Sequence, residues 1–522
     1  MQSLTDITRY DESLAAYSKD KLWALFDGDR SSLNIAHECI DRHPDERIAV
    51  NIIDGRGLQH DESYTFAELR EWSNRFANYL CSRGLESGDR VAIMLEPSLI
   101  FYAALFGAMK ANCVAVPLFT LFGPEGIRLR LDDCSPRFFI AESEHIQAAG
   151  ERNGCVFETA SDVFLQELSH FDSAFDWQSS ADDMAMYQYT SGTTRQLPDA
   201  IKHRHRAIVT VMLAALYGTG VRPDDNFCCP SSPAWGHGLW HGTLAPLSMG
   251  AQITSYRGKF DPQRLLAGLE RYRINNLSAA ATHYRMMRNA ASGKKIRHHL
   301  NKLSFTGEPI DSETESWARQ TFGRAVCSMY GTTEVGVILV SYPAAEDFIM
   351  KPGSLGKPIP GLKISIVDAE GQPCPPGRKG EIVMERQNSW FSTKDLGYTD
   401  DDGYFYHAGR ADDVIISAGW TMSAVEIENV LMKHPDINEV AVVASPDETR
   451  GHIPKAFVVA KRNGDINFEA EIVQLAKNNL SQHEYPRAIA FVSELPKLPA
   501  GKINRKKLRE MENSRTANPN VS

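Results

Sequence analysis

The 522-residue sequence predicts an α/β protein with a large N-terminal domain and a smaller C-terminal α/β domain. The chain is too long for a single hydrophobic core, so two or more domains are expected. Strand, helix and strand patterns follow one another between residues 91 and 117 at the spacing of a βαβ unit, which indicates largely parallel sheets. Short strands and helices alternate again after residue 425, and we place the boundary between domains 1–410 and 411–522.

The first regular elements are a capped helix and the βαβ unit. Residues 65–68, Thr-Phe-Ala-Glu, have the form of a capping box, and apolar side chains then recur at helical spacing at Phe66, Leu69, Trp72, Phe76 and Tyr79. Residues 91–95 and 114–117 predict two buried strands, with an apolar helix over residues 99–109 between them. That helix is about half as long as a bilayer span, so no membrane-spanning segment is expected.

A loop rich in hydroxyl groups comes next, at residues 189–198, Tyr-Thr-Ser-Gly-Thr-Thr-Arg-Gln-Leu-Pro. Four hydroxyl side chains around one glycine bury little apolar area, but they can supply donors to an anion; the residues are Thr190, Ser191, Gly192, Thr193 and Thr194. No Gly-Lys-Ser/Thr sequence closes the loop, so it is not a Walker motif. A phosphate cradle and an ordinary polar surface loop fit the pattern about equally well.

Two tryptophans lie among glycines in residues 231–241, a segment that we expect to be too broken for a regular element. Trp235 and Trp240 either line a pocket for an apolar part of a substrate or fill the core. His237 and His241 have the spacing of a zinc pair on a helix. The glutamate of a zinc hydrolase is missing, however, and Gly238 and Gly242 oppose a helix, so zinc is not expected.

Two further strands end in glycine turns, where ligands of open α/β sheets collect. Residues 303–306 lead into Gly307, Glu308 and Pro309, and residues 328–330 lead into Gly331-Thr-Thr-Glu334. Two hydroxyls and a carboxylate after the second strand suit a phosphate with its Mg²⁺, although a solvated turn is the alternative.

The C-terminal part begins with an acidic hairpin at residues 394–404 and then forms the small α/β unit. Its predicted elements are a helix to about residue 432, strands at 440–444 and 456–460, a helix over 472–480 and a last strand at 489–492. The polar tail after Glu512 is expected to be disordered.

Composition excludes several partners. A net charge of -10 offers no basic face for a nucleic acid, so no nucleic-acid partner is expected. Nine cysteines without a Cys-x-x-Cys pair indicate neither a zinc site nor a disulfide framework, and we interpret them as reduced thiols of a cytoplasmic enzyme. The polar, acidic N-terminus lacks the apolar run of a signal peptide.

Taken in order, these segments resemble the adenylate-forming (AMP-binding) superfamily, nearest to its acetyl- and medium-chain acyl-CoA synthetases. The resemblance covers about residues 63–508 and is carried by Trp235 in its glycine setting, Tyr330-Gly-Thr-Thr-Glu334, Gly409-Arg-Ala-Asp-Asp-Val-Ile415 and Leu495-Pro-Lys-Leu-Pro-Ala-Gly-Lys-Ile503. It implies a mobile C-terminal lid that turns at a hinge near Asp412. It also implies an acid:CoA ligase that uses ATP and Mg²⁺ to form an acyl-adenylate and then transfers the acyl group to coenzyme A.

The resemblance also implies roles for single residues. The pyrophosphate part of ATP would lie on Thr190 to Thr194, with Arg195 beside it. The remaining nucleotide contacts would come from Gly307, Glu308, Pro309, Tyr330, Gly331, Asp395 and Arg410, with Thr333 on the α-phosphate and Glu334 on Mg²⁺. Lys502 would bridge the carboxylate and the α-phosphate. Coenzyme A would pass Ser417, Ala418 and Gly419, and the acyl pocket would include Trp235, Gly236, His237 and Gly336.

Four departures from the family pattern stand out. The family loop ends in a lysine that binds phosphate, whereas this chain is one residue longer there and has Asp199, with Arg195 and Lys202 as substitute cations. Lys394 replaces the usual glycine before Asp395. The segment 380–390 is shorter than usual, and Trp420-Thr421 replaces an aromatic-arginine pair.

An acid:CoA ligase is therefore the leading hypothesis. Transfer to an acyl carrier protein and a non-catalytic acyl or nucleotide binder are the alternatives. The small-molecule partner is a carboxylic acid, for which we expect a medium, branched, cyclic or aromatic acyl group, and a homodimer is left open.

Overall fold

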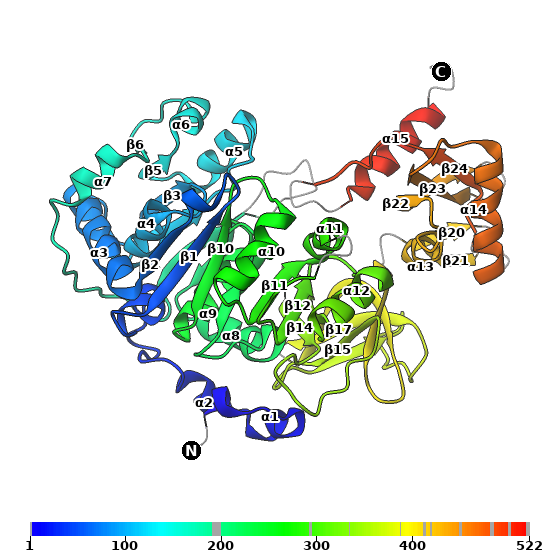
Figure 1. Ribbon diagram of the computed structural model, residues 1–522, viewed down its shortest axis with the longest axis horizontal. Coiled ribbons are helices and arrows are strands. Elements are labelled where there is room, and N and C mark those ends of the chain that lie inside the picture. The colour runs from blue at the N-terminus through cyan, green and yellow to red at the C-terminus, as the bar shows by residue number, and fades with distance from the viewer. Residues whose placement is uncertain are drawn as a thin grey trace. The chain divides into compact units, whose positions relative to one another are not determined.

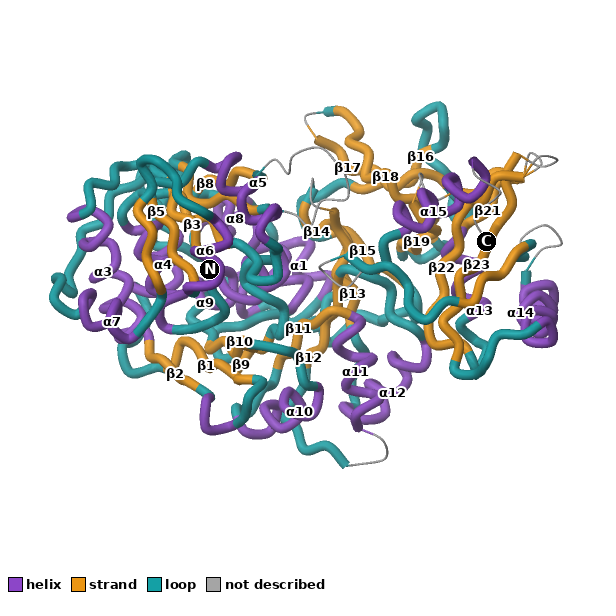
Figure 2. The backbone as a smooth tube through the Cα atoms, turned by 90° about the horizontal axis from the view of Figure 1, so that it is seen from above, coloured by secondary structure: helices purple, strands orange, loops and turns teal. Residues whose placement is uncertain are grey.

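The computed structural model describes residues 3–189, 200–291, 295–332, 335–386, 388–410, 414–417, 420–447, 451–480, 485–498 and 503–517. The chain divides into two compact units (Figures 1 and 2). Unit 1 contains Met1–Gly331 and Gly336–Gly361, and unit 2 contains Thr332–Val335 and Leu362–Ser522.

Unit 1 contains a six-stranded sheet that includes the expected βαβ unit. Its order is β6 (Val156–Thr159), β5 (Phe138–Ala141), β3 (Arg90–Met94), β4 (Val114–Pro117), β7 (Met184–Gln188) and β8 (Ile201–Arg204). Strands β3 and β4 are parallel, and α4 (Leu99–Lys110) connects them, so the βαβ prediction is confirmed. Only β8 runs antiparallel to its neighbour. Figures 1 and 2 show α3, α4 and α7 beside this sheet.

The second sheet of unit 1 is parallel in its centre. Its order is β15 (Ser354–Pro358), β14 (Gly336–Val340), β13 (Cys327–Thr332), β12 (Lys302–Thr306), β11 (Asn276–Ala280), β9 (Asn226–Cys228), β10 (Gln252–Arg257), β1 (Ile48–Asp54) and β2 (Glu62–Thr65). The pairs from β1 through β10, β9, β11 and β12 to β13 are parallel, whereas β2 pairs antiparallel with β1 and β15 pairs antiparallel with β14. Parallel strands place their C-terminal ends at one edge, where the predicted ligand turns lie.

Local sequence accounts for the two central helices. In α3 (Phe66–Ser82), Thr65 and Glu68 form the predicted capping box, with the Thr65 amide donating to Glu68 Oε2 over 2.7 Å. Helix α4 is apolar on all sides and almost every one of its residues is buried, as expected for a helix enclosed by a core.

The other helices of unit 1 are mostly short. They are α1 (Tyr10–Ala16), α2 (Lys19–Trp23), α5 (Pro124–Cys134), α6 (Ser143–Ala149), α7 (Asp162–Leu168), α8 (Ala207–Ala214), α9 (Ala245–Ser248), α10 (Pro262–Arg271), α11 (Ala281–Ala291) and α12 (Ser312–Phe322). Short 3₁₀ turns occur at η1 (Leu4–Asp6) and η3 (Leu58–His60). Three segments are π-helical: η2 (His37–Asp41), η4 (Ala215–Thr219) and η5 (His237–Leu244).

Unit 2 contains three groups of strands. An antiparallel meander comprises β16 (Ile364–Val367), β17 (Gly380–Arg386), β18 (Ser389–Thr399) and β19 (Phe405–Arg410). A hairpin joins β20 (Val414–Ser417) and β21 (Trp420–Ser423), and a further sheet holds β22 (Ile437–Asp447), β23 (Gly451–Ala460) and β24 (Ala488–Phe491). The helices are α13 (Ala424–Leu431), α14 (Ile466–Asn479) and α15 (Arg505–Ala517).

The small C-terminal α/β unit is confirmed in its element order. In its core, side chains of α13 and α14 pack against the β22–β24 sheet. The helices contribute Ile427, Leu431, Phe468 and Ile472, and the strands contribute Val442 and Val458. The expected disorder after Glu512 is wrong for the next five residues, because α15 continues to Ala517. The expected hinge residue, Asp412, lies outside the described residues, so the boundary between residues 410 and 411 stays a prediction.

Candidate active site

The hydroxyl-rich loop starts from a firmly held residue. Thr190 to Asp199 lie outside the described residues, but Tyr189, at the end of β7, is buried. Its hydroxyl donates to Asp133 Oδ2 over 2.5 Å, and the Arg130 guanidinium lies 5.7 Å from its ring centre. Helix α5 thus fixes the point at which the predicted phosphate loop leaves the sheet.

The exits of β11 and β12 lie side by side, as the parallel pairing requires. Gly307 follows β12 with φ of 95°, a left-handed conformation that suits glycine. The side chain of Glu308 accepts a hydrogen bond from Thr282 at the start of α11, and Arg285 lies 3.9 Å away. The structure therefore places Gly307, Glu308 and Pro309 directly after the C-terminal end of β12, and their contact with adenine stays a prediction.

The turn between β13 and β14 is closed by two glycines. A Cβ atom on Gly331 would overlap the carbonyl of Gly336, so the backbones approach too closely for any other residue. Thr332 has a buried hydroxyl oxygen for which the described residues provide no hydrogen-bond partner. A polar ligand at the turn would provide one.

Asp395 in unit 2 is placed by a bulge in β18. The pairing with β17 changes register between Glu381 and Val383, so β18 carries extra residues at this point. Lys394 has φ of 60°, and Asp395 is buried, with Oδ1 lying 3.7 Å from Nε2 of His407. Asp395 and Arg410 are register partners, so the structure brings the two predicted ribose residues together.

The segment around the tryptophans is more regular than predicted. Residues 237–244 form the π-helix η5, so the expectation of an irregular segment is wrong from His237 onward, whereas residues 231–235 are irregular as expected. Gly238 makes the helix feasible rather than opposing it, because a Cβ atom there would overlap the backbone carbonyls of Ser231 and Ser232. π-Helical turns occur frequently at functional sites.

His237 is held on both sides by hydroxyl groups. Its Nδ1 lies 3.0 Å from Ser231 Oγ, and its Nε2 lies 2.9 Å from Ser278 Oγ on β11. Burial lowers the pKa of His237 to about 3, so the imidazole is neutral.

The two tryptophans have different surroundings. Trp240 is buried and donates from Nε1 to Gln188 Oε1 over 2.9 Å, so this tryptophan fills the core instead of lining a pocket. Trp235 is partly exposed, and its ring stands edge-on to that of His237 with centres 6.0 Å apart.

Sequence reasoning missed several members of this cluster, namely Gln188, His203, Ser231, Ser278 and His283. Three histidines near η5 each have one buried ring nitrogen without a partner among the described residues: His203 Nε2, His241 Nδ1 and His283 Nδ1. Burial lowers the pKa of each to about 4. In the sequence, only His237 and His241 stood out, because their spacing resembles that of a zinc-binding pair. His203 and His283 are distant in the sequence and gave no signal.

Several predicted site residues lie outside the described residues: Thr190, Ser191, Gly192, Thr193, Thr194, Arg195, Thr333, Glu334, Asp412, Ala418, Gly419 and Lys502. Ser417 is described as the last residue of β20. In the part of the chain that the structure describes, no group of three or more His, Cys, Asp or Glu side chains is arranged to hold a metal ion. No described helix combines the length and apolar character needed to cross a membrane.

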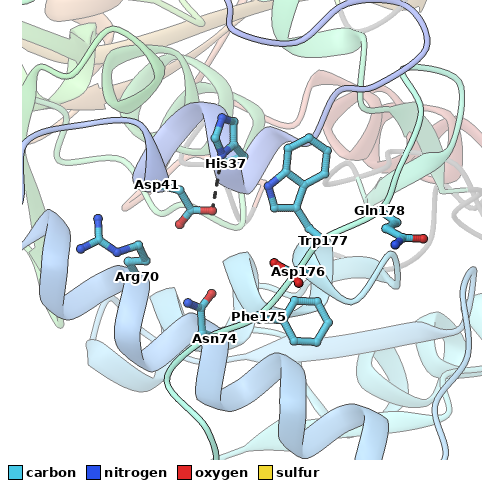
Figure 3. A pocket seen from close by; sticks show the side chains of 8 residues that line it. All are labelled: His37, Asp41, Arg70, Asn74, Phe175, Asp176, Trp177 and Gln178. Carbon is cyan, nitrogen blue, oxygen red and sulfur yellow. Dashed lines mark ion pairs between the residues drawn. The ribbon is translucent and has the colours of Figure 1, made fainter.

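A polar hollow of about 500 Å³ lies in unit 1, lined by none of the predicted site residues (Figure 3). It is lined by His37, Asp41, Arg70, Asn74, Phe175, Asp176, Trp177 and Gln178. At its base, Nζ of the buried Lys110 lies 2.6 Å from Asp41 Oδ1 and 2.7 Å from Asn74 Oδ1. These groups already satisfy one another, so the hollow is interpreted as a structural feature.

Comparisons with known proteins identify the family to which the chain belongs. A model of the AMP-binding enzyme family matches residues 36–390, and one of the AMP-binding enzyme C-terminal domain matches residues 426–502. Acetyl-coenzyme A synthetase of Bacillus subtilis (strain 168) is 30% identical over 528 residues, covering 92% of this chain and 91% of that protein.

Two further similarities cover most of the chain. The mitochondrial acyl-coenzyme A synthetase ACSM3 of Rattus norvegicus is 30% identical over 508 residues, covering 88% of this chain and 86% of that protein. The crystal structure of an acyl-CoA synthetase from Brucella canis matches with a TM-score of 0.76 and 29% identity, covering 98% of this chain and all of that one.

Proposed function

Because the chain belongs to the family of AMP-binding enzymes, we propose that it is an ATP-dependent acid:CoA ligase. In the first step a carboxylate oxygen attacks the α-phosphorus of ATP, and pyrophosphate leaves as an acyl-adenylate forms. In the second step the thiol of coenzyme A attacks the acyl carbon, and AMP leaves as the thioester forms. The observation that carries this proposal is the match of both family models, in order, over most of the chain.

The nucleotide contacts come from the strand ends. We assign the phosphates to the loop after β7, the adenine to the turn Gly307 to Pro309 and the α-phosphate to Thr333. Asp395 accepts hydrogen bonds from the ribose hydroxyls, because a carboxylate is an acceptor, and Arg410 donates beside it. The bulge in β18 supports the assignment of Asp395, because it places this buried carboxylate opposite Arg410 in the sheet register.

Lys502 lowers the barrier of the first step. Negative charge develops on the oxygens around the pentavalent phosphorus, and a cation held near them stabilises the transition state more than the ground state. The matching C-terminal family model ends at this residue. Glu334 would hold Mg²⁺, which would neutralise phosphate charge. The Thr332 hydroxyl, which has no hydrogen-bond partner among the described residues and comes shortly before Glu334 in the sequence, supports a phosphate ligand at this turn.

Coenzyme A is the proposed acceptor, and its pantetheine passes Ser417, Ala418 and Gly419. A residue without a side chain at position 419 leaves room for the thiol. Transfer to a carrier-protein thiol would use the same passage. A cytoplasmic location is also proposed, because all nine cysteines lie in described residues and carry free thiols.

Pyrophosphate release from ATP and Mg²⁺, measured over a panel of carboxylic acids with and without coenzyme A, tests the function. We expect release with one class of acid, together with stoichiometric AMP and acyl-CoA. Release without transfer to coenzyme A would instead assign a carrier protein as acceptor. Absence of turnover with every acid, alongside measurable ATP binding, would contradict the ligase.

The role of Lys502 can be tested in the two half-reactions. Lys502→Ala should nearly abolish adenylate formation but spare thioester formation from presynthesised adenylate, because the lysine acts on the phosphate only in the first step. Lys507→Ala is the matched control, since this exposed lysine lies in the same basic segment. Equal loss in both half-reactions for Lys502→Ala would contradict the assigned role.

A further inference from the structure

We propose that Thr282 and Arg285, on helix α11, are positioning residues for the adenine of ATP. They bind the carboxylate of Glu308 and so fix the conformation of the turn formed by residues 307–309. This role rests on the proposed function, because the ligase assignment places adenine at that turn. It extends the nucleotide site to a helix that contains none of the site residues predicted from the sequence.

The sheet brings the start of α11 beside this turn. Strands β11 and β12 are parallel neighbours, with Ala280 opposite Thr306. Helix α11 begins one residue after Ala280, and the turn begins one residue after Thr306. Figures 1 and 2 also show α11 next to α12, the helix that follows the turn. Side chains on the first turns of α11 can therefore reach the whole connection between β12 and α12, residues 307–311.

Two donors converge on one oxygen of Glu308. The Thr282 hydroxyl donates a hydrogen bond to Oε1, and Nη1 of Arg285 lies 3.9 Å from the same atom. Thr282 and Arg285 are three residues apart, so their side chains are neighbours on the helix surface. The carboxylate is thus held toward α11, whereas Gly307 and Pro309, on either side of it, are exposed. The Glu308 side chain therefore anchors a turn whose neighbouring residues remain accessible to a ligand.

Arg285 also holds the far end of the connection. Its Nε donates to Oδ2 of Asp311 over 3.3 Å. Asp311 is the N-cap of α12 and accepts from the Thr314 amide over 2.8 Å. One guanidinium thus lies between two carboxylates of the same connection, which suits the several N–H donors of arginine. The connection is therefore held both at Glu308 and at the start of α12.

The turn needs such anchors because of its first residue. Gly307 has φ of 95°, and glycine loses more conformational freedom than any other residue when its backbone is fixed. The two contacts to Glu308 restrict the turn before a ligand arrives. A site that is ordered in advance loses less entropy on binding, so its affinity is higher. Loss of either contact should therefore weaken the binding of a ligand that touches the turn.

Arg288 provides a matched comparison on the same helix. Its Nη1 donates to Asp311 Oδ1 over 3.1 Å and to Thr314 Oγ1 over 3.0 Å, and it lies 3.0 Å from Glu313 Oε2. These partners belong to α12 and its N-cap rather than to the turn. Arg285 shares Asp311 with Arg288 but also reaches the turn through Glu308. Replacing Arg288 should therefore lower the stability of the fold and leave the KM for ATP nearly unchanged.

The test compares Thr282→Val, which keeps the shape of the side chain but removes the donor, with Thr282→Ser, which keeps the donor. We expect the KM for ATP and the dissociation constant of AMP to rise about tenfold in Thr282→Val, because a hydrogen bond to a charged group is lost. The KM is measured by pyrophosphate release and the dissociation constant by isothermal titration calorimetry. Thr282→Ser should stay near the parent values, and the KM for the acid should change little in both variants. Arg285→Met should raise the KM for ATP, whereas Arg288→Met should not.

Inorganic tripolyphosphate separates a role in adenine binding from a general loss of structure. It carries phosphate groups without a base, so its inhibition constant against ATP should be the same in Thr282→Val as in the parent enzyme. Equal weakening of ATP, AMP and tripolyphosphate would overturn the inference, as would an unchanged KM for ATP. Because Thr282 acts through Glu308, adding Thr282→Val to Glu308→Ala should weaken ATP binding no further. Effects that multiply in the double variant would overturn the positioning role.

Failure of the proposed function gives a different result. If no acid is turned over while AMP binds and Thr282→Val weakens that binding, the ligase is contradicted and the role in adenine binding stands. If the parent protein binds neither ATP nor AMP, both are overturned. If Thr282→Val is unfolded by circular dichroism, the pair Arg285→Met and Arg288→Met decides. An equal KM for ATP in these two variants would then overturn the inference.

Discussion

Lowering the pH below 6.5 should destabilise this protein steeply, because it contains a set of buried, neutral histidines. Burial is the largest cause of a lowered pKa at six positions, with values of about 3 or 4 at His43, His203, His205, His237, His241 and His283. The unfolded chain binds these protons near pH 6.5, whereas the folded chain does not. Their stabilising contribution is therefore complete above about pH 6.5 and is lost as the pH falls toward 4.

The magnitude follows from the two pKa values. At about pH 5.5 a histidine with a folded pKa of about 4 contributes roughly 1.4 kcal/mol less to the free energy of unfolding than at neutral pH. Six such residues give a loss on the order of 8 kcal/mol, which is comparable with the whole stability of a typical protein. His37 acts in the opposite direction, because its hydrogen bond to Asp41 raises its pKa, but it offsets at most one proton.

Urea unfolding at several pH values between about 7.5 and 5.5 measures this loss. The free energy of unfolding should fall with a slope approaching several protons, each worth about 1.4 kcal/mol per pH unit. His205→Asn is the matched variant, because the amide oxygen of asparagine can take the place of Nδ1 in accepting from the Ile35 amide at 3.0 Å. It should reduce the slope by about one proton. A stability that stays constant down to about pH 5.5, or an unchanged slope in the variant, would refute the reasoning.

Three further predictions concern single residues. Lys394→Gly should raise the free energy of unfolding by about 0.5–1 kcal/mol, because φ of 60° is strained for lysine, and a destabilised variant in urea unfolding would contradict this. Lys110→Met should lower the free energy of unfolding by about 3–5 kcal/mol, because Asp41 loses its buried partner at 2.6 Å. Adding Asp41→Asn should recover part of this loss, because the unpaired charge is then removed. If the effects of the two substitutions simply add, the two side chains do not form a stabilising pair. Arg195→Ala should raise the KM for ATP several-fold and leave the KM for the acid nearly unchanged, and Lys202→Ala is the comparison. If Arg195→Ala has the same KM for ATP as the unsubstituted enzyme, Arg195 is not the substitute cation.

Where local sequence determines the backbone, the fold could be predicted closely. The capping box at Thr65 and Glu68 marked the first residue of α3, and the apolar run over residues 99–109 marked a helix that is in fact Leu99–Lys110. In these segments, capping and burial favour the same structure. The π-helix η5 could not be predicted, because Gly238 is unfavourable for a helix in isolation and becomes suitable only through contacts with Ser231 and Ser232.

The candidate site shows the same division. Strand ends followed by glycine turns predicted that Gly307 and Gly331 lie at the ends of parallel strands, and the parallel pairing of β12 with β13 confirms this placement, whereas their contact with a ligand stays a prediction. The partners of His237 lay beyond local reasoning. Ser278 is 41 residues away in the sequence and meets the ring only because β11 belongs to the same sheet. Long-range hydrogen bonds of this kind leave no periodic pattern.

Two departures from the family pattern gain a physical account in unit 2. In the segment 380–390, which the sequence predicts to be shorter than usual, Arg386 pairs with Ser389, and Asn388 has φ of 62°. Asparagine tolerates this left-handed conformation better than most residues. Lys394 adopts the same conformation without that tolerance, one residue before Asp395.

The strain at Lys394 is explained by what the bulge does for Asp395. The Lys394 amide donates to Glu381 Oε1 and to Ser392 Oγ, each at 3.1 Å, and the Thr393 hydroxyl donates to the carbonyl of Ile382 at 2.7 Å. These bonds hold β18 in the bulged register although lysine is poorly suited to it. Strain of this kind persists where surrounding contacts over-determine the backbone, and it is common at functional sites. The buried Asp395 is thus kept in place by its neighbours on β17 and β18, which is why losing the usual glycine need not displace the proposed ribose ligand.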